Sequence, residues 1–160
     1  MGVTKARAAG IVPRATGVLQ GYADKAVFRG FSAEGSVYKI AWHRNQTYEL
    51  RLDARRKRLA FPALLPKVPR EIYREFQRFL KSRTTREVPE HRRIDPRRAR
   101  LSCAIRRGTV SLAITSRDGD YEYATRKLIH LVHEIFMFFL ADYVEYQVEA
   151  YNLDPDQPIV

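Results

Sequence analysis

Hydrophobic and polar residues alternate along two blocks of the chain, which is the pattern of β-strands that bury one face. The first block spans residues 36–65 and contains three such runs, so it predicts a three-stranded antiparallel meander. The second block spans residues 101–114, where two runs flank a turn at 106–109, and it predicts a β-hairpin. The inward positions of this hairpin are Leu101, Cys103, Ile105, Val110, Leu112 and Ile114.

The opposite positions of the hairpin are small, so a helix or a second sheet is expected to lie close on that face as well. These positions are Ser102, Ala104, Ser111 and Ala113. In the meander, a three-residue loop at 45–47 pairs Trp42 with Leu50 and keeps apolar side chains opposite one another. Pro62 has no N–H for a ladder hydrogen bond, so the third strand is expected at a sheet edge or with a bulge.

Apolar residues recur at helical spacing in two further segments. One segment follows Pro69 and predicts a middle helix. Its apolar stripe consists of Ile72, Tyr73, Phe76, Phe79 and Leu80. The other runs from Asp120, a good N-cap residue, to about Tyr151. About 30 helical residues would extend ~45 Å, which is long for a small domain, so we expect a break near residues 141–142.

These elements predict an α+β fold with the order βββ-α-ββ-α. An antiparallel sheet is built from the three-stranded meander and the second hairpin, with a middle helix and a long C-terminal helix. We assign residues 36–151 to this single α+β domain and residues 152–160 to a C-terminal tail. Residues 1–35 are rich in alanine and glycine without clear periodicity and predict an irregular or partly mobile N-terminal segment. Residues 83–100 contain two prolines and predict a long loop.

Charge is distributed unevenly along the chain, whose net formal charge is +11. Residues 51–107 carry 19 basic and 6 acidic side chains, whereas residues 108–160 carry 3 basic and 9 acidic ones. The positive charge is therefore concentrated in the middle of the chain. A strongly basic region predicts a polyanionic partner such as nucleic acid.

The candidate binding residues are basic side chains on two turns and one loop, where they can reach a partner. Most are arginines, whose planar guanidinium groups bind phosphate in a bidentate manner. No Phe, Tyr or Trp lies within residues 83–100, so contact with a nucleic-acid backbone is favoured over base stacking. The candidates are Arg55, Arg56, Lys57, Arg58, Arg92, Arg93, Arg97, Arg98, Arg100, Arg106 and Arg107.

The sequence contains no familiar catalytic motif, so we expect a non-enzymatic domain without a cofactor or metal. His130, His133 and Glu134 share a helix face at a spacing that metal ligands can use, but no second ligand cluster accompanies them. Polar residues beside an apolar stripe are the alternative interpretation. The single cysteine, Cys103, alternates with apolar neighbours and is expected to be an unreactive core residue.

The run Ile135–Ala141 is apolar on all sides, and such a helix must be covered from several directions. Seven residues are far fewer than the ~20 that span a membrane. With no secretory signal and a single cysteine, this predicts a cytoplasmic protein. The large side chains of the run are assigned to the core or to a homodimer interface. They are Ile135, Phe136, Phe138, Phe139 and Leu140.

The element order also resembles that of a known family. The stretch Thr109–Ile114, a turn, and the helix from Asp120 are similar to the core of type III secretion chaperone-like proteins, and the likeness in element order covers about residues 36–140. The resemblance implies a small homodimer that holds a partner polypeptide. It provides the alternative function, a dimeric protein-interaction module, for which an acidic protein partner would suit the basic charge.

Overall fold

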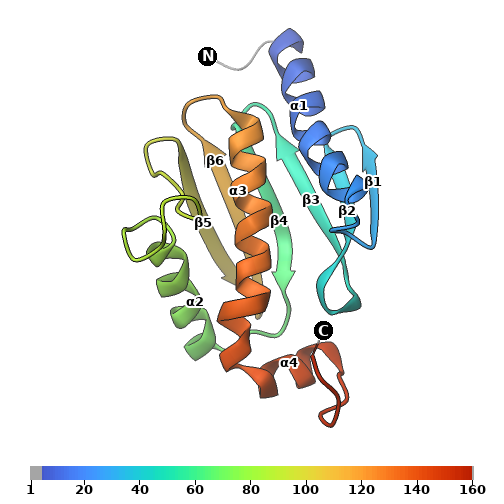
Figure 1. Ribbon diagram of the computed structural model, residues 1–160, viewed down its shortest axis with the longest axis vertical. Coiled ribbons are helices and arrows are strands. Elements are labelled where there is room, and N and C mark those ends of the chain that lie inside the picture. The colour runs from blue at the N-terminus through green and yellow to red at the C-terminus, as the bar shows by residue number, and fades with distance from the viewer. Residues whose placement is uncertain (1–4, 160) are drawn as a thin grey trace.

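The computed structural model describes residues 5–159 and contains a six-stranded antiparallel sheet (Figure 1). Residues 1–4 of the predicted irregular segment and residue 160 of the predicted tail lie outside the described residues. The strand order is β1-β2-β3-β4-β6-β5, so β1 and β5 form the two edges. The strands are β1 (Gly30–Glu34), β2 (Val37–Ala41), β3 (Thr47–Asp53), β4 (Arg58–Leu65), β5 (Ala99–Arg106) and β6 (Thr109–Ser116).

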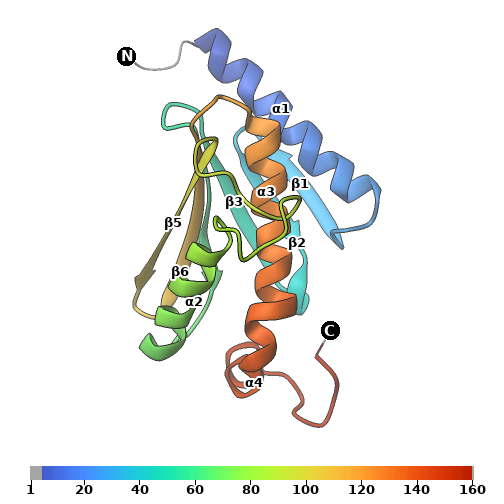
Figure 2. The same cartoon turned by 60° about the vertical axis from the view of Figure 1, so that its left-hand side comes forward.

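Helices cover one face of this sheet, which confirms the α+β class. They are α1 (Lys5–Asp24), α2 (Arg70–Ser82) and α3 (Tyr121–Glu134), whereas α4 (Val144–Tyr151) lies past the end of the strands (Figure 1). Figures 1 and 2 show α1 and α3 side by side across the sheet, with α2 beside β5 on the same side. Between α2 and β5, residues 83–98 form the long loop that the sequence predicts.

The hydrophobic core fills the space between the helices and the face of the sheet that they cover, called the inner face below. Every second residue of the central strands points into it, as the alternation predicts. The largest contributions come from side chains that are at most 1% exposed. They include Tyr38, Leu50, Leu59, Phe61 and Leu112 of the sheet and Leu128, Val132 and Phe136 of the C-terminal helical region.

The alternation in β2 and β3 is confirmed, but the predicted register is wrong. Leu50 pairs with Tyr38 and not with Trp42. The connection is longer than predicted: the Trp42 N–H donates to the Gln46 carbonyl, and the turn between them places Arg44 at a φ of 56°. Registers that differ by an even number of residues bury the same side chains. The hydrophobic pattern alone therefore does not distinguish them.

Two further local predictions are confirmed, one within β4 and one at the turn between β5 and β6. The pairing of β4 with β6 shifts between Phe61 and Leu65, which is the irregularity expected around Pro62. The β5–β6 hairpin turns through Arg107 and Gly108, whose φ angles are 51° and 80°. Two consecutive positive φ angles are the signature of a tight type I′ turn, whose twist matches that of the strands.

The prediction of an irregular N-terminal segment at 1–35 is wrong, because α1 and β1 occupy most of it. Ile11, Ala15 and Leu19 recur every four residues and are 7%, 0% and 0% exposed. This narrow stripe holds α1 against the core. Pro13 inside the helix and several glycines interrupt the pattern, so the stripe does not stand out in the sequence.

The predicted break in the C-terminal helix is confirmed. After α3, a π-helical segment, Ile135–Phe139, and a 3-10 turn, Leu140–Asp142, redirect the chain into α4 (Figure 1). The predicted start of this helix is also confirmed. The Asp120 carboxylate accepts a hydrogen bond from the Tyr123 N–H at 2.9 Å, which satisfies one of the free donors of the first turn.

Candidate polyanion-binding surface

The outer face of the sheet, opposite to the helices, is open. Arg100 and Arg106 point outward from β5 and are exposed, whereas the inward Ala99 is buried. The small residues of the hairpin lie on this outer face, where the sequence predicted a cover. No helix or strand within residues 5–159 lies over it (Figure 2). The helix α3 packs instead on the apolar inner face, because only that face offers a large apolar surface.

On the outer face, strand pairing places a row of small side chains next to a row that contains two arginines. One row across β4, β6 and β5 consists of Ala60, Ala113 and Ser102. The adjacent row contains Arg58 on β4 and Arg100 on β5, with β6 between them. Short floor side chains leave room for the long arginine side chains to extend over the sheet.

A shallow groove of about 570 Å³ lies on this face, and we call it the basic groove. Four arginines and one aspartate line it, so its formal charge is positive. Arg51 bonds to Glu49 at 2.6 Å, and Arg56 lies 3.8 Å from Asp53. The lining residues are Arg51, Asp53, Arg56, Arg58, Ala60, Pro62, Ala104, Arg106, Thr109 and Ser111.

Arg58 has a guanidinium nitrogen that is shielded from water and unsatisfied. Its Nε atom is buried and has no hydrogen-bond partner among residues 5–159. A buried donor without an acceptor costs about 1–3 kcal/mol. An oxyanion in the basic groove reaches this atom only if the Arg58 side chain moves, because the atom is covered.

The structure brings two of the predicted basic segments together. The backbone N–H groups of Ser116 and Arg117 donate to the carbonyl oxygens of Lys57 and Arg98, each at 2.8 Å. The β3–β4 turn, which carries the predicted residues 55–58, and the residues before β5 therefore lie on either side of the end of β6. The other predicted pair, Arg106–Arg107, lies at the far end of β5, about 20 Å away at 3.3 Å per residue.

Other predicted arginines make contacts within the protein and do not line the basic groove. Arg92 lies 3.4 Å from the Glu134 carboxylate, and Arg93 donates to the Val88 carbonyl at 3.0 Å. The structure does not place these two arginines with the other predicted residues, because α3 and the loop itself offer them acceptors. The remaining pairs are Arg97–Asp95 at 3.4 Å, Arg98–Asp118 at 2.7 Å and Arg98–Asp120 at 2.8 Å.

Sequence reasoning missed Arg51, which lines the basic groove from β3. A signal was available in the alternation, since Arg51 stands between the inward Leu50 and Leu52 and must point outward. The alternation does not show that the outer face of β3 and the outer face of the β5–β6 hairpin form one surface. Pairing of β4 with β6 brings the two faces together.

His130, His133 and Glu134 do not form a metal site. Glu134 is buried and bonds to two arginines, whereas both imidazoles are on the exposed side of α3. Across residues 5–159, no group of three or more His, Cys, Asp or Glu side chains is placed to hold a metal ion. On this helix face, Glu134 therefore forms buried ion pairs, whereas His130 and His133 are surface residues.

Cys103 is half buried on β5, and its Sγ atom lies 3.6 Å from the Tyr73 hydroxyl. Burial raises the pKa of this thiol, which disfavours the nucleophilic thiolate at neutral pH. This environment agrees with the unreactive role that the sequence predicts, although an edge strand leaves the side chain less buried than a central one would.

The apolar run after α3 belongs mainly to the core of its own chain. The buried members are Ile135, Phe136, Phe139 and Leu140. Phe138 is 55% exposed and its neighbour Met137 is 49% exposed. The guanidinium carbon of Arg92 lies 5.4 Å from the centroid of the Phe138 ring. Of the five residues assigned to the core or an interface, only Phe138 is available to another molecule.

No protein-family model, curated protein or solved structure matches this chain. Within the described part of the chain, no helix is both long and apolar enough to cross a membrane. Function must therefore be inferred from the arrangement of side chains on the surface.

Proposed function

We propose that this protein is a non-enzymatic binding domain that holds a nucleic-acid backbone on the outer face of its sheet. The basic groove is the contact surface, and its arginines bind phosphate oxygens. The observation that carries this proposal is the groove itself, which four arginines and a single aspartate line on the open face of the sheet.

The spacing of the arginines suits an extended polyanion better than a single phosphate ion. Arg58 and Arg106 pair with Thr115 and Thr109 of β6, so they stand about 20 Å apart along the sheet at 3.3 Å per residue. One strand of B-form DNA advances about 3.4 Å along the helix axis per phosphate, so the backbone carries several phosphates over this length. Different arginines can therefore contact different phosphates of the same backbone.

The floor of the groove favours contact without base recognition. Its side chains are short, which lets a bulky backbone approach the sheet closely. Among residues 5–159, none that lines the basic groove is aromatic, so these residues offer no ring on which a base could stack. Binding is therefore expected to depend on charge and not on the base sequence of the nucleic acid.

Salt-dependent binding to a random-sequence DNA duplex tests the proposal. The duplex is labelled with a fluorophore, and affinity is measured by anisotropy between about 50 and 200 mM salt. The variant R56Q/R58Q/R106Q removes three guanidinium groups that line the basic groove. If each contacts one phosphate, the slope of log affinity against log salt should become shallower by about 2–3.

A matched control removes the same charge from another surface. The variant R70Q/R74Q/K81Q changes three exposed basic residues of α2, which lies on the helical side of the sheet. This control should retain most of the affinity and the salt slope. Equal losses in the two variants, or no binding of the unchanged protein at low salt, would contradict the proposal.

A second candidate function is the dimeric, chaperone-like interaction module. It is favoured by the exposure of Phe138 and Met137, two large apolar side chains that are adjacent on the π-helical segment. Multi-angle light scattering at micromolar concentration should then find a dimer that the variant F138S converts to a monomer. A protein that is monomeric throughout that range would exclude this candidate.

A further inference from the structure

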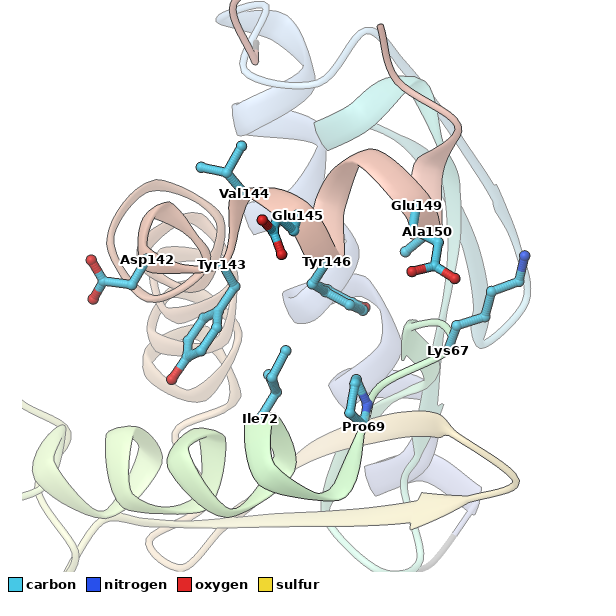
Figure 3. A pocket seen from close by; sticks show the side chains of 10 residues that line it. All are labelled: Lys67, Pro69, Ile72, Asp142, Tyr143, Val144, Glu145, Tyr146, Glu149 and Ala150. Atoms are coloured by element: carbon cyan, nitrogen blue, oxygen red, sulfur yellow. The ribbon is translucent and has the colours of Figure 1, made fainter. Parts of the chain in front are cut away.

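A cleft of about 590 Å³ lies between the start of α2 and α4. It is on the helical side of the sheet and shares no lining residue with the basic groove. Figure 3 shows Pro69 and Ile72 on one wall, with their side chains directed toward Tyr143 and Tyr146 on the other wall. The interior of the cleft is therefore apolar and aromatic.

Acidic side chains stand around this apolar interior. Asp142, Glu145 and Glu149 line the cleft, and Lys67 stands at the end near Glu149, away from Asp142 (Figure 3). The ion pairs formed within residues 5–159 involve none of these three carboxylates. On a chain with a net charge of +11, this cleft is a local region of opposite sign.

Two further observations describe the mouth of the cleft. Burial, followed by the nearby carboxylates of Glu75 and Asp142, raises the pKa of Tyr143, so negative potential extends into the cleft. Val144 is 51% exposed, although it is a large apolar residue. An apolar surface with an acidic border is suited to a ligand that combines an apolar side chain with cations.

We propose that this cleft docks a short basic segment of a partner protein, in which lysine or arginine flanks a large apolar side chain. The apolar side chain fills the space between Ile72 and Tyr143. The flanking cations lie against Glu145 and Glu149. The volume is within the 300–1,000 Å³ that is usual for ligand sites, which is enough for a few side chains.

A second copy of this chain is a poorer occupant than a separate partner. The exposed basic turns at 55–58 and 106–108 contain no apolar side chain, and the exposed Val27 between Lys25 and Arg29 makes self-association an outcome to be tested. Two copies with a net charge of +11 each also repel one another over the screening distance of about 10 Å. This docking proposal does not depend on nucleic-acid binding, because the two surfaces have no residue in common.

A defined peptide tests the proposal. The probe is a fluorescein-labelled amphipathic peptide that contains only leucine and lysine, spaced to form a helix with one apolar face. Because the protein is basic elsewhere, charge repulsion opposes binding of this probe outside the cleft. We expect saturable binding that the variant E145K/E149K weakens by about tenfold or more. The milder variant E145Q/E149Q should give a smaller loss.

A matched control changes two exposed carboxylates outside the cleft. The variant E34K/E87K adds the same positive charge and should lose little affinity for the probe. Circular dichroism confirms that each variant keeps its fold. Equal losses in E145K/E149K and E34K/E87K, or no binding of the probe to the unchanged protein, would overturn the proposal.

The apolar part of the proposal has its own test. The variant V144N should weaken binding of the leucine–lysine probe several-fold, and a peptide of lysine alone should bind weakly. If the lysine peptide binds equally well, the cleft is only an electrostatic surface and the proposal fails. Self-association of the protein that E145K/E149K abolishes would assign the cleft to a second copy and would also overturn the proposal.

Discussion

The guanidinium group of Arg83 donates a hydrogen bond to the carboxylate of Glu134 at 2.9 Å. This contact joins the loop after α2 to the end of α3 across 51 residues of sequence. A second guanidinium group, that of Arg92, lies 3.4 Å from the other carboxylate oxygen. Both oxygens of Glu134 are therefore occupied, which explains why it does not combine with its histidine neighbours as a metal ligand.

Replacement of Glu134 by alanine should destabilise the protein strongly. The substitution leaves Arg83, whose side chain is only 16% exposed, without its charged partner. Loss of one member of a buried pair costs about 3–5 kcal/mol, and the partial exposure of Arg92 places the expected loss at about 3 kcal/mol. Urea denaturation measures this change in the free energy of unfolding.

The variant E122A provides the comparison for this pair. Glu122 bonds to Arg14 on the surface, where both side chains are nearly half exposed. Its removal should cost less than about 1 kcal/mol. If E134A and E122A lower the free energy of unfolding equally, the Arg83–Glu134 contact has no special structural role.

Stability should decrease as the pH falls because of His43. This ring packs against Trp42 and Phe136, with both centroid distances at 4.6 Å. Burial, followed by the charges of His133 and Arg44, lowers the pKa of His43 from 6.5 to about 4. The unfolded chain therefore binds a proton below pH 6.5, while the folded chain resists protonation down to about pH 4. Stability is greatest above this window and is lost on going down through it.

The variant H43F isolates this effect, because phenylalanine keeps the ring contacts and cannot be protonated. Between pH 7 and pH 4 the unchanged protein should lose about 2 kcal/mol more than H43F, a value reduced for the partial exposure of the ring. Urea denaturation at a series of pH values measures both curves. Parallel curves would show that His43 is protonated equally in the folded and unfolded states.

Asp120 should contribute to stability as the N-cap of α3. Its carboxylate accepts the Tyr123 N–H at 2.9 Å and pairs with Arg98 at 2.8 Å. The variant D120A should lower the free energy of unfolding by about 1–2 kcal/mol, as loss of an N-cap does. The variant D120S retains a capping oxygen without the charge and should lose less. If D120S and D120A unfold alike in thermal denaturation, the cap contributes little.

Base composition should have little effect on nucleic-acid affinity. The basic groove presents guanidinium groups and short aliphatic side chains, and no aromatic ring lines it. Single strands of uridine alone, of adenosine alone and of mixed sequence should therefore bind within a few-fold of one another. Competition measured by anisotropy checks this expectation. A strong preference for one strand would indicate a base-stacking contact away from the groove.

Elements with a local cause were predictable from the sequence. The bulge in β4 follows from the missing N–H of Pro62, and the start of α3 follows from the capping side chain of Asp120. The helix α1 was not predictable, because Pro13 interrupts its stripe and the helix is held by contacts with distant elements. The register of β2 and β3 depends on an unusual turn at Arg44, which the alternation does not encode.

The sequence by itself determined the α+β class, both hairpin regions and the excess of positive charge between residues 51 and 107. Only the tertiary structure decided which arginines share a surface. Arg92 meets a carboxylate 42 residues away, whereas Arg58 and Arg100 lie on either side of β6 and face outward together. The physical reason is that an ionic contact depends on the distance between two groups in space, and strand pairing sets that distance independently of their separation along the chain.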